Sequence, residues 1–91
     1  MAHAERKTQM KQVLVIAKFD QAEALRVAAG LTLMNDAVKV DVLGPLEESA
    51  AVNEQKEVID FAEVQCEIVL ANDLIKRIAS DIMEADVVVV L

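Results

Sequence analysis

The chain has 91 residues, of which 55% are hydrophobic and only two, Phe19 and Phe61, are aromatic. This length fits a single domain with a modest core. The formal charge of −7 argues against a protein that binds the phosphate backbone of nucleic acids or an anionic membrane surface, because both contacts need clustered Lys and Arg. The acidity either keeps a small apolar protein soluble or selects a basic partner.

Residues 1–10 are polar and lack periodicity, so we expect a flexible N-terminal lead-in in which His3 is incidental. Residues 11–91 form the expected single domain. It opens with "QVLVIA" at 12–17, a continuous run rich in Val and Ile. Such a run is typical of a strand that is buried on both faces of a parallel sheet.

A helix is predicted directly after this strand. Asp20 and Glu23 form a capping box at its start, and Asn35-Asp36 end it. Its core-facing residues recur at helical spacing: Ala24, Val27, Ala28, Leu31 and Met34.

The second strand is predicted at 37–44, where Lys39 and Asp41 alternate with valines and indicate a partly wet face near a sheet edge. A second helix is expected at about 46–60, with Pro45 suited to its first turn. Its apolar residues are sparse (Ala51, Val52, Val58 and Ile59), so we expect it to pack thinly or to border a partner.

The third strand is predicted at 64–70 and a fourth at 86–91, the latter again continuously apolar. Between them lies a third helix, capped by Asn72 or Asp73, with core-facing Ile75, Ile78, Ala79 and Ile82. The order β-α-β-α-β-α-β predicts an α/β fold in which a parallel sheet of four strands alternates with three helices. The apolar strand "VVVVL" needs cover on both faces of the sheet, and three helices are too few to be sure of covering it. This is one reason to expect an oligomer.

Motifs for cofactors and metals are missing from the sequence. It contains neither GxGxxG nor GxxxxGK[ST], and its first strand-to-helix loop has no glycine, so we expect no nucleotide cofactor. One histidine and one cysteine cannot make a structural zinc site or a disulfide framework. No segment approaches the roughly 20 apolar residues of a membrane span, and no hydrophobic signal core is seen, so we expect a cytoplasmic protein.

A default binding rim follows from the fold, because open α/β sheets bind ligands beyond the carboxyl ends of their strands. The residues expected there are Lys18, Phe19, Asp20, Gly44, Pro45, Ala71, Asn72 and Asp73. Lys18 either holds an anion or lowers the pKa of a thiol, or is simply exposed. Asp20 and Asp73 also have a structural interpretation as helix caps.

The stretch "KQVLVIAKFDQAEALRVAAGLTLMNDAVKVDVLG" resembles the opening of DsrE/DsrF-like proteins, and "CEIVLANDLIKRIASDIMEADVVVV" is similar to their third strand, loop, helix and final strand. This resemblance covers roughly residues 11–91. It implies a small three-layer flavodoxin-like fold and cytoplasmic oligomers, often trimers or hexamers. It also implies sulfur relay with partner proteins, in which a cysteine carries sulfur as a persulfide.

The family's sulfur-carrying cysteine does not transfer to this chain. Its position after the third strand is occupied by Ala71 in "IVLAND", whereas Cys66 lies near the start of that strand. Cys66 shares a face with aliphatic residues, has no histidine as a base and lies beside Glu67, which favours a structural thiol with a raised pKa. A role for Cys66 as a sulfur carrier is the weaker alternative.

Three functions therefore compete. The first is sulfur relay through Cys66, which would make the chain sulfurtransferase-like. The second is a non-catalytic or accessory DsrE-like subunit that serves assembly or binds a small ligand. The third is a module that binds a small ligand or anion with Lys18 and the strand-end rim. The sequence gives no positive sign of catalysis, and we expect a homo-oligomer without a cofactor or metal.

Overall fold

The computed structural model describes residues 11–34 and 36–91, except for the side chain of Ala71. The predicted lead-in at 1–10, with His3, lies outside the described residues. So does Asn35, at the predicted end of the first helix.

Four strands and three helices alternate along the described chain. The strands are β1 (Gln12–Ala17), β2 (Ala37–Leu43), β3 (Gln65–Val69) and β4 (Val87–Val90). The helices are α2 (Gln21–Thr32), α3 (Ala50–Phe61) and α4 (Leu74–Glu84), and a short 3-10 turn, η1 (Ala71–Asp73), precedes α4. Among these helices, none is both long and apolar enough to span a membrane.

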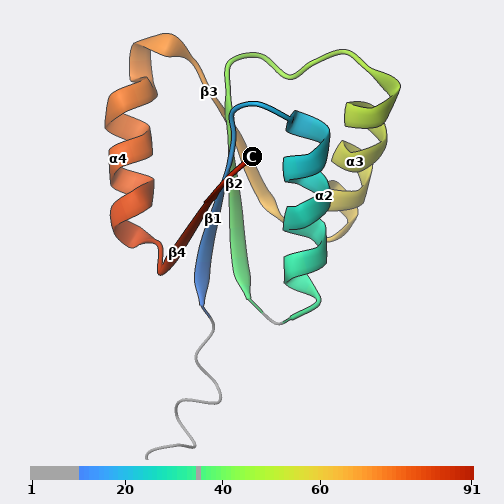
Figure 1. The fold of residues 1–91 in the computed structure, drawn as a ribbon, viewed down its shortest axis with the longest axis horizontal. Helices are drawn as coiled ribbons and strands as arrows, with labels where there is room; N and C mark the ends of the chain where they lie inside the picture. The colour runs from blue at the N-terminus through green and yellow to red at the C-terminus, as the bar shows by residue number, and fades with distance from the viewer. Residues whose placement is uncertain (1–10, 35) are drawn as a thin grey trace, which may run out of the picture.

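The strands form one sheet in the order β3-β2-β1-β4, and every pairing is parallel. Helices α2 and α3 cover one face of the sheet and α4 covers the other (Figure 1). The predicted three-layer α/β fold with four parallel strands is therefore confirmed. The strand β2 is internal, so its predicted place near an edge is wrong. The edges are β3 and β4.

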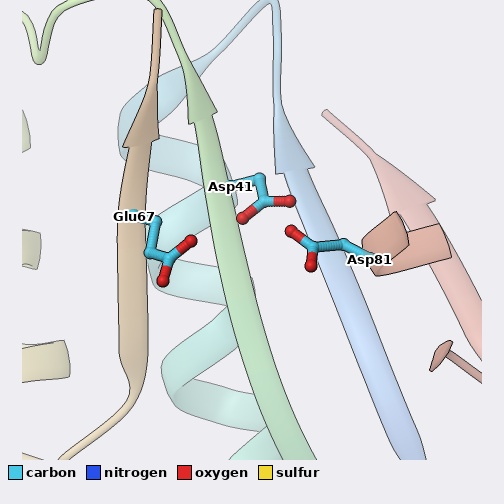
Figure 2. A group of neighbouring side chains, drawn as sticks. All are labelled: Asp41, Glu67 and Asp81. Carbon is cyan, nitrogen blue, oxygen red and sulfur yellow. The ribbon is translucent and has the colours of Figure 1, made fainter. Parts of the chain in front are cut away.

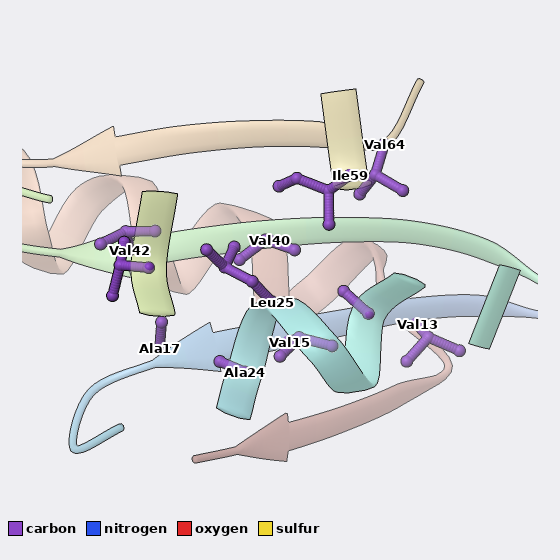
Figure 3. Packing of buried hydrophobic residues seen from close by; sticks show 11 residues of the cluster. Val13, Val15, Ala17, Ala24, Leu25, Val40, Val42, Ile59 and Val64 are labelled. Atoms are coloured by element: carbon purple, nitrogen blue, oxygen red, sulfur yellow. The ribbon is translucent and has the colours of Figure 1, made fainter. Parts of the chain in front are cut away.

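The hydrophobic core lies between the sheet and the helices α2 and α3 (Figure 3). Alternate residues of β1 and β2 point into it, as the period of two requires. Its fully buried members include Val15, Ala17, Ala24, Leu25, Ala28, Val40, Val42, Val52 and Ile59. The small residues of α2 allow that helix to approach the sheet closely.

Local hydrogen bonds set the start of α2. The side chain of Asp20 accepts a hydrogen bond from the backbone N–H of Glu23 at 3.0 Å, which confirms the predicted N-cap. The buried Gln21 side chain donates to the carbonyl of Pro45 and accepts from the N–H of Glu47. This residue therefore ties the start of α2 to the loop that follows β2.

The prediction for α3 was wrong in its start and in its packing. The helix is capped by Ser49, whose hydroxyl accepts from the N–H of Val52, so Pro45 precedes the helix and is not in its first turn. Although its apolar residues are few, Val52 and Ile59 are fully buried in the core. The helix is therefore well attached.

The prediction of a core-facing side for α4 was also wrong. No residue of α4 is buried, and Ile75 is 84% exposed. Asp73 occupies the N-cap position but makes no capping hydrogen bond with its side chain. An apolar cavity of about 350 Å³ lies beside the helix, lined by Leu43, Leu74, Ile75, Ile78, Ala79 and Ile82. The apolar side of α4 thus lines an open cavity and does not interlock with the sheet.

Candidate functional site

Cys66 lies on β3, an edge strand, and faces the layer of α2 and α3. Its register partner on β2 is the buried Val40, and its side chain is half-buried against the core. Burial raises the pKa of the Cys66 thiol, and the carboxylate of Asp60 adds to that effect, while Lys56 opposes it. A thiol in this setting is mostly protonated at neutral pH and is therefore a poor nucleophile.

The residues of the predicted binding rim follow the carboxyl ends of the strands, as expected. Lys18, Phe19 and Asp20 are exposed after β1, and the Lys18 ammonium lies 4.9 Å from the centre of the Phe19 ring. Asp20 is occupied as a helix cap. Gly44 has a φ of 91°, in the left-handed region that favours glycine.

The remaining rim residues, Ala71, Asn72 and Asp73, form the 3-10 turn η1 before α4, where Asn72 and Asp73 are exposed. Neither the apolar cavity beside α4 nor a polar cavity beside β1 and β2 is lined by a residue of the predicted rim. The described rim residues therefore offer exposed groups outside these two cavities.

A cluster of carboxyl groups lies between the sheet and α4, away from the rim. Asp41 on β2 has Glu67 as its register partner on β3 and Ile16 as its partner on β1. Asp81 points toward Asp41 from α4 (Figure 2). One carboxyl oxygen from each of the three acids lies within 4.8 Å of the others.

Two basic side chains enter this cluster. The Nζ of Lys39 lies 2.9 Å from an Asp81 oxygen and 3.4 Å from a Glu67 oxygen. Arg77 on α4 pairs with Glu67. Asp41, by contrast, has 0% exposure, and no group among the described residues donates a hydrogen bond to either of its carboxyl oxygens or to Oδ2 of Asp81. Three buried acceptor atoms thus lack a donor.

The pKa values of the two aspartates are pushed apart. The pKa of Asp41 is raised to about 7, mainly by burial and in part by the neighbouring Asp81 carboxylate, while Lys39 and Arg77 partly offset these two effects. The pKa of Asp81 is lowered, because the adjacent Asp41 carboxyl group and the Lys39 ammonium favour its ionised form. Of the two groups, Asp41 therefore favours the protonated form and Asp81 the ionised form.

The spacing of the three acids would also suit a cation, but Lys39 and Arg77 already supply two positive charges there. With Asp41 protonated, the charges of Glu67 and Asp81 are balanced. A polar cavity of about 240 Å³ reaches Lys39 and Asp81, but neither Asp41 nor Glu67 lines it. The cluster therefore works as a neutral network that joins α4 to the sheet.

Sequence reasoning missed this cluster, although one signal was present. Asp41 stands between Val40 and Val42, in the middle of a strand, and an acid in that place needs a partner. The alternation correctly placed Lys39 and Asp41 on one side of β2. It did not identify Asp81, because the approach of α4 to β2 joins Lys39 to a residue 42 positions later in the chain.

A second feature is the outer edge of the sheet at β4. Within residues 11–34 and 36–91, this strand pairs with β1 on one side only, and all its residues are valine. Val88 is 39% exposed and Val90 is 50% exposed. The strand therefore presents both apolar side chains and one free row of backbone groups.

Comparison of the chain with protein-family models, with curated proteins and with solved structures finds no match.

Proposed function

We propose that this protein is a non-catalytic assembly module, which pairs with a second copy of itself through the outer edge of β4. The observation that carries the proposal is the exposed all-valine strand at the end of the sheet. Proteins usually protect such edges with charges, proline or bulges, because unpaired N–H and C=O groups recruit another strand. Residues 87–90 carry neither a charge nor a proline.

A second copy is the partner that suits this edge. The chain carries a formal charge of −7, so two copies repel one another except where they meet through an uncharged surface. A two-fold axis would pair β4 with β4 in antiparallel fashion and make one continuous sheet. The other edge, β3, carries Glu67 in its middle and is less suited to close pairing.

This contact alone makes a dimer. The trimer or hexamer that the resemblance to DsrE/DsrF-like proteins implies would require a second contact as well. The proposal of an accessory member without thiol chemistry is supported by the half-buried Cys66, whose thiol pKa is raised. It is supported too by alanine at position 71, where the resembled family carries its sulfur.

The mass of the protein in solution tests the proposal. We expect light scattering at micromolar concentrations to give twice the 9.9 kDa of one chain. Val88→Lys should give a monomer, because the two-fold axis brings the new charges together in the centre of the contact. Val90→Lys serves as an independent second variant on the same strand.

The matched control is Leu33→Lys, which places the same charge at another exposed apolar residue, at the end of α2. It should leave the dimer intact. A monomeric mass for the native protein would contradict the proposal, and so would a dimer that withstands both β4 variants while they remain folded by circular dichroism.

A further inference from the structure

Three buried carboxyl oxygens without a donor need a positive charge or a proton, because an unpaired buried carboxylate is very costly. We propose that Asp41 and Asp81 share one proton, and that this proton holds α4 against the sheet. The O–H of Asp41 donates to Oδ2 of Asp81, and when that O–H bond breaks the proton passes to solvent. The inference goes beyond self-association and does not depend on it.

The surroundings of Asp41 leave no other donor for it. On its own strand Lys39 is engaged with Asp81 and Glu67. Arg77, from α4, is engaged with Glu67. From β1 the neighbour in register is the apolar Ile16. The charged groups that face Asp41 are therefore Lys39, Glu67, Arg77 and Asp81, and both cations among them are already paired.

A proton fits this place better than a metal ion. One proton satisfies an Asp41 oxygen and an Asp81 oxygen at once, and it leaves the five charged groups of the cluster with no net charge. A divalent cation would leave an excess positive charge beside Lys39 and Arg77. The cavity next to Asp81 does not extend to Asp41, so it offers no space for a hydrated ion in contact with both aspartates.

The attachment of α4 depends unusually strongly on this network. None of its residues is buried, and its apolar residues line a cavity. Two side chains of α4 form ion pairs with the sheet, and of these Asp81, at 9% exposure, is more buried than Arg77, at 43%. Loss of the shared proton puts two like charges face to face at this point, and the helix is then held less tightly.

The opening of α4 should therefore be linked to pH. The closed form keeps the proton up to a pH of about 7, whereas an exposed aspartate loses it near 3.8. Between these limits opening releases one proton, so the opening constant should rise about tenfold per pH unit. Above a pH of about 7 Asp41 is ionised in both the closed and the open form, and the equilibrium constant for opening should no longer change with pH.

Amide hydrogen exchange, corrected for the intrinsic effect of pH, tests this in the native chain. We expect the protection of α4 amides to fall about tenfold per unit from pH 5 to 7, while α2 amides, which lie on the other face, serve as the internal reference. Asp41→Asn should abolish the slope, because the amide donates to Asp81 at every pH.

A control variant accompanies it. Asp60→Asn removes an exposed acid of α3 that pairs with Lys56, outside the cluster, and it should keep the slope. Titration of the Asp41 carboxyl carbon by NMR reads the same proton directly, even where a variant folds poorly.

The proposal is overturned if α4 protection is independent of pH, if Asp41→Asn keeps the slope, or if Asp41 titrates near pH 4. Addition of Ca²⁺ or Mg²⁺ at pH 8 supplies the remaining test. Should either ion restore the protection of α4 in the native chain, and a chelator remove it, the oxygens hold a metal and the proton proposal fails.

Discussion

Asp41 shows how the surroundings of one residue decide its chemistry. It lies in the middle of an internal strand and is fully buried. Such a carboxyl group is neutral in water only at acidic pH, but here burial brings its pKa to about 7. The sequence pattern predicted a partly solvent-exposed acid at this position. Asp41 instead favours its protonated form, because α4 covers this side of the sheet and places Asp81 beside it.

The stability of the whole protein should fall as the pH rises through the range in which Asp41 is protonated only in the folded state. The folded-state pKa is raised, so the stabilisation is complete below about pH 4 and is lost as the pH approaches 7. We expect the free energy of unfolding in urea to drop by up to about 3 kcal/mol from pH 5 to 8. Asp41→Asn should remove most of this dependence.

The lowered pKa of Asp81 works in the opposite direction, since its stabilisation is lost as the pH falls through its folded-state pKa. The effect of Asp81 falls mainly below pH 5, so it should not mask the decrease in unfolding free energy between pH 5 and pH 8. A native protein as stable at pH 8 as at pH 5 would show that Asp41 is ionised throughout.

At the scale of elements, the three helices are attached by different forces. Helices α2 and α3 bury Leu25, Val52 and Ile59 completely, whereas α4 buries no residue and is joined through ion pairs. Apolar burial is worth more than exposed or half-exposed ion pairs. The molecule therefore has one well-packed face and one weakly packed face.

Truncations on the two faces should differ sharply. Leu25→Ala leaves a cavity in the core and should cost about 3 kcal/mol of unfolding free energy. Ile75→Ala, on α4, should change it by less than about 0.5 kcal/mol, because its side chain is mostly exposed. Denaturant curves of both variants at pH 5, where α4 is attached, would measure this; equal costs would contradict a one-sided core.

The end of α3 offers a stabilising change. Glu63 follows the C-cap residue with a φ of 61°, a left-handed conformation that favours glycine. The N–H of Glu63 donates to the Asp60 carbonyl and that of Val64 donates to the Ile59 carbonyl, as in a Schellman motif. We expect Glu63→Gly to raise the unfolding free energy by about 0.5–1 kcal/mol.

The same substitution at Ala62, whose φ of −80° suits any residue, is the matched control and should not stabilise. Thermal unfolding of the two variants compares them directly. A loss of stability in Glu63→Gly would mean that the glutamate side chain contributes more than its backbone conformation costs.

Local signals in the sequence predicted the helices and strands well where a single signal marked an element. The Val and Ile runs marked the strands, and Asp20 with Glu23 marked the start of α2. These signals misled where two of them competed. Pro45 suggested the first turn of α3, but the helix begins after Ser49, which is its N-cap residue. The period of Ile75, Ile78 and Ile82 predicted a buried face for α4, but the ion pairs of α4 with the sheet are made by Arg77 and Asp81.

The candidate site could not be predicted in full because it is built from distant parts of the chain. The alternation placed Lys39 and Asp41 together, but Glu67 and Asp81 join them only through the register of β3 and the crossover of α4. Sequence reasoning favoured the carboxyl ends of the strands instead, where the structure has exposed residues and a helix cap.

At the scale of the whole molecule, the sheet is open at both ends while the surface charge is strongly negative. The edge at β4 is uncharged, so it is the part of the sheet boundary where two copies can approach without repulsion. Added salt screens the repulsion between the remaining surfaces and should therefore strengthen the dimer.

An NMR experiment on a mixed dimer tests self-association through β4 most directly. One copy carries ¹³C and ¹⁵N and the other is unlabelled, and isotope-filtered spectra then report only contacts between copies. We predict close contacts between the backbone protons of Val88 and Val89 of one copy and the same strand of the other, as antiparallel pairing requires. Contacts confined to other surfaces, or no contacts together with a monomeric mass, would contradict the account.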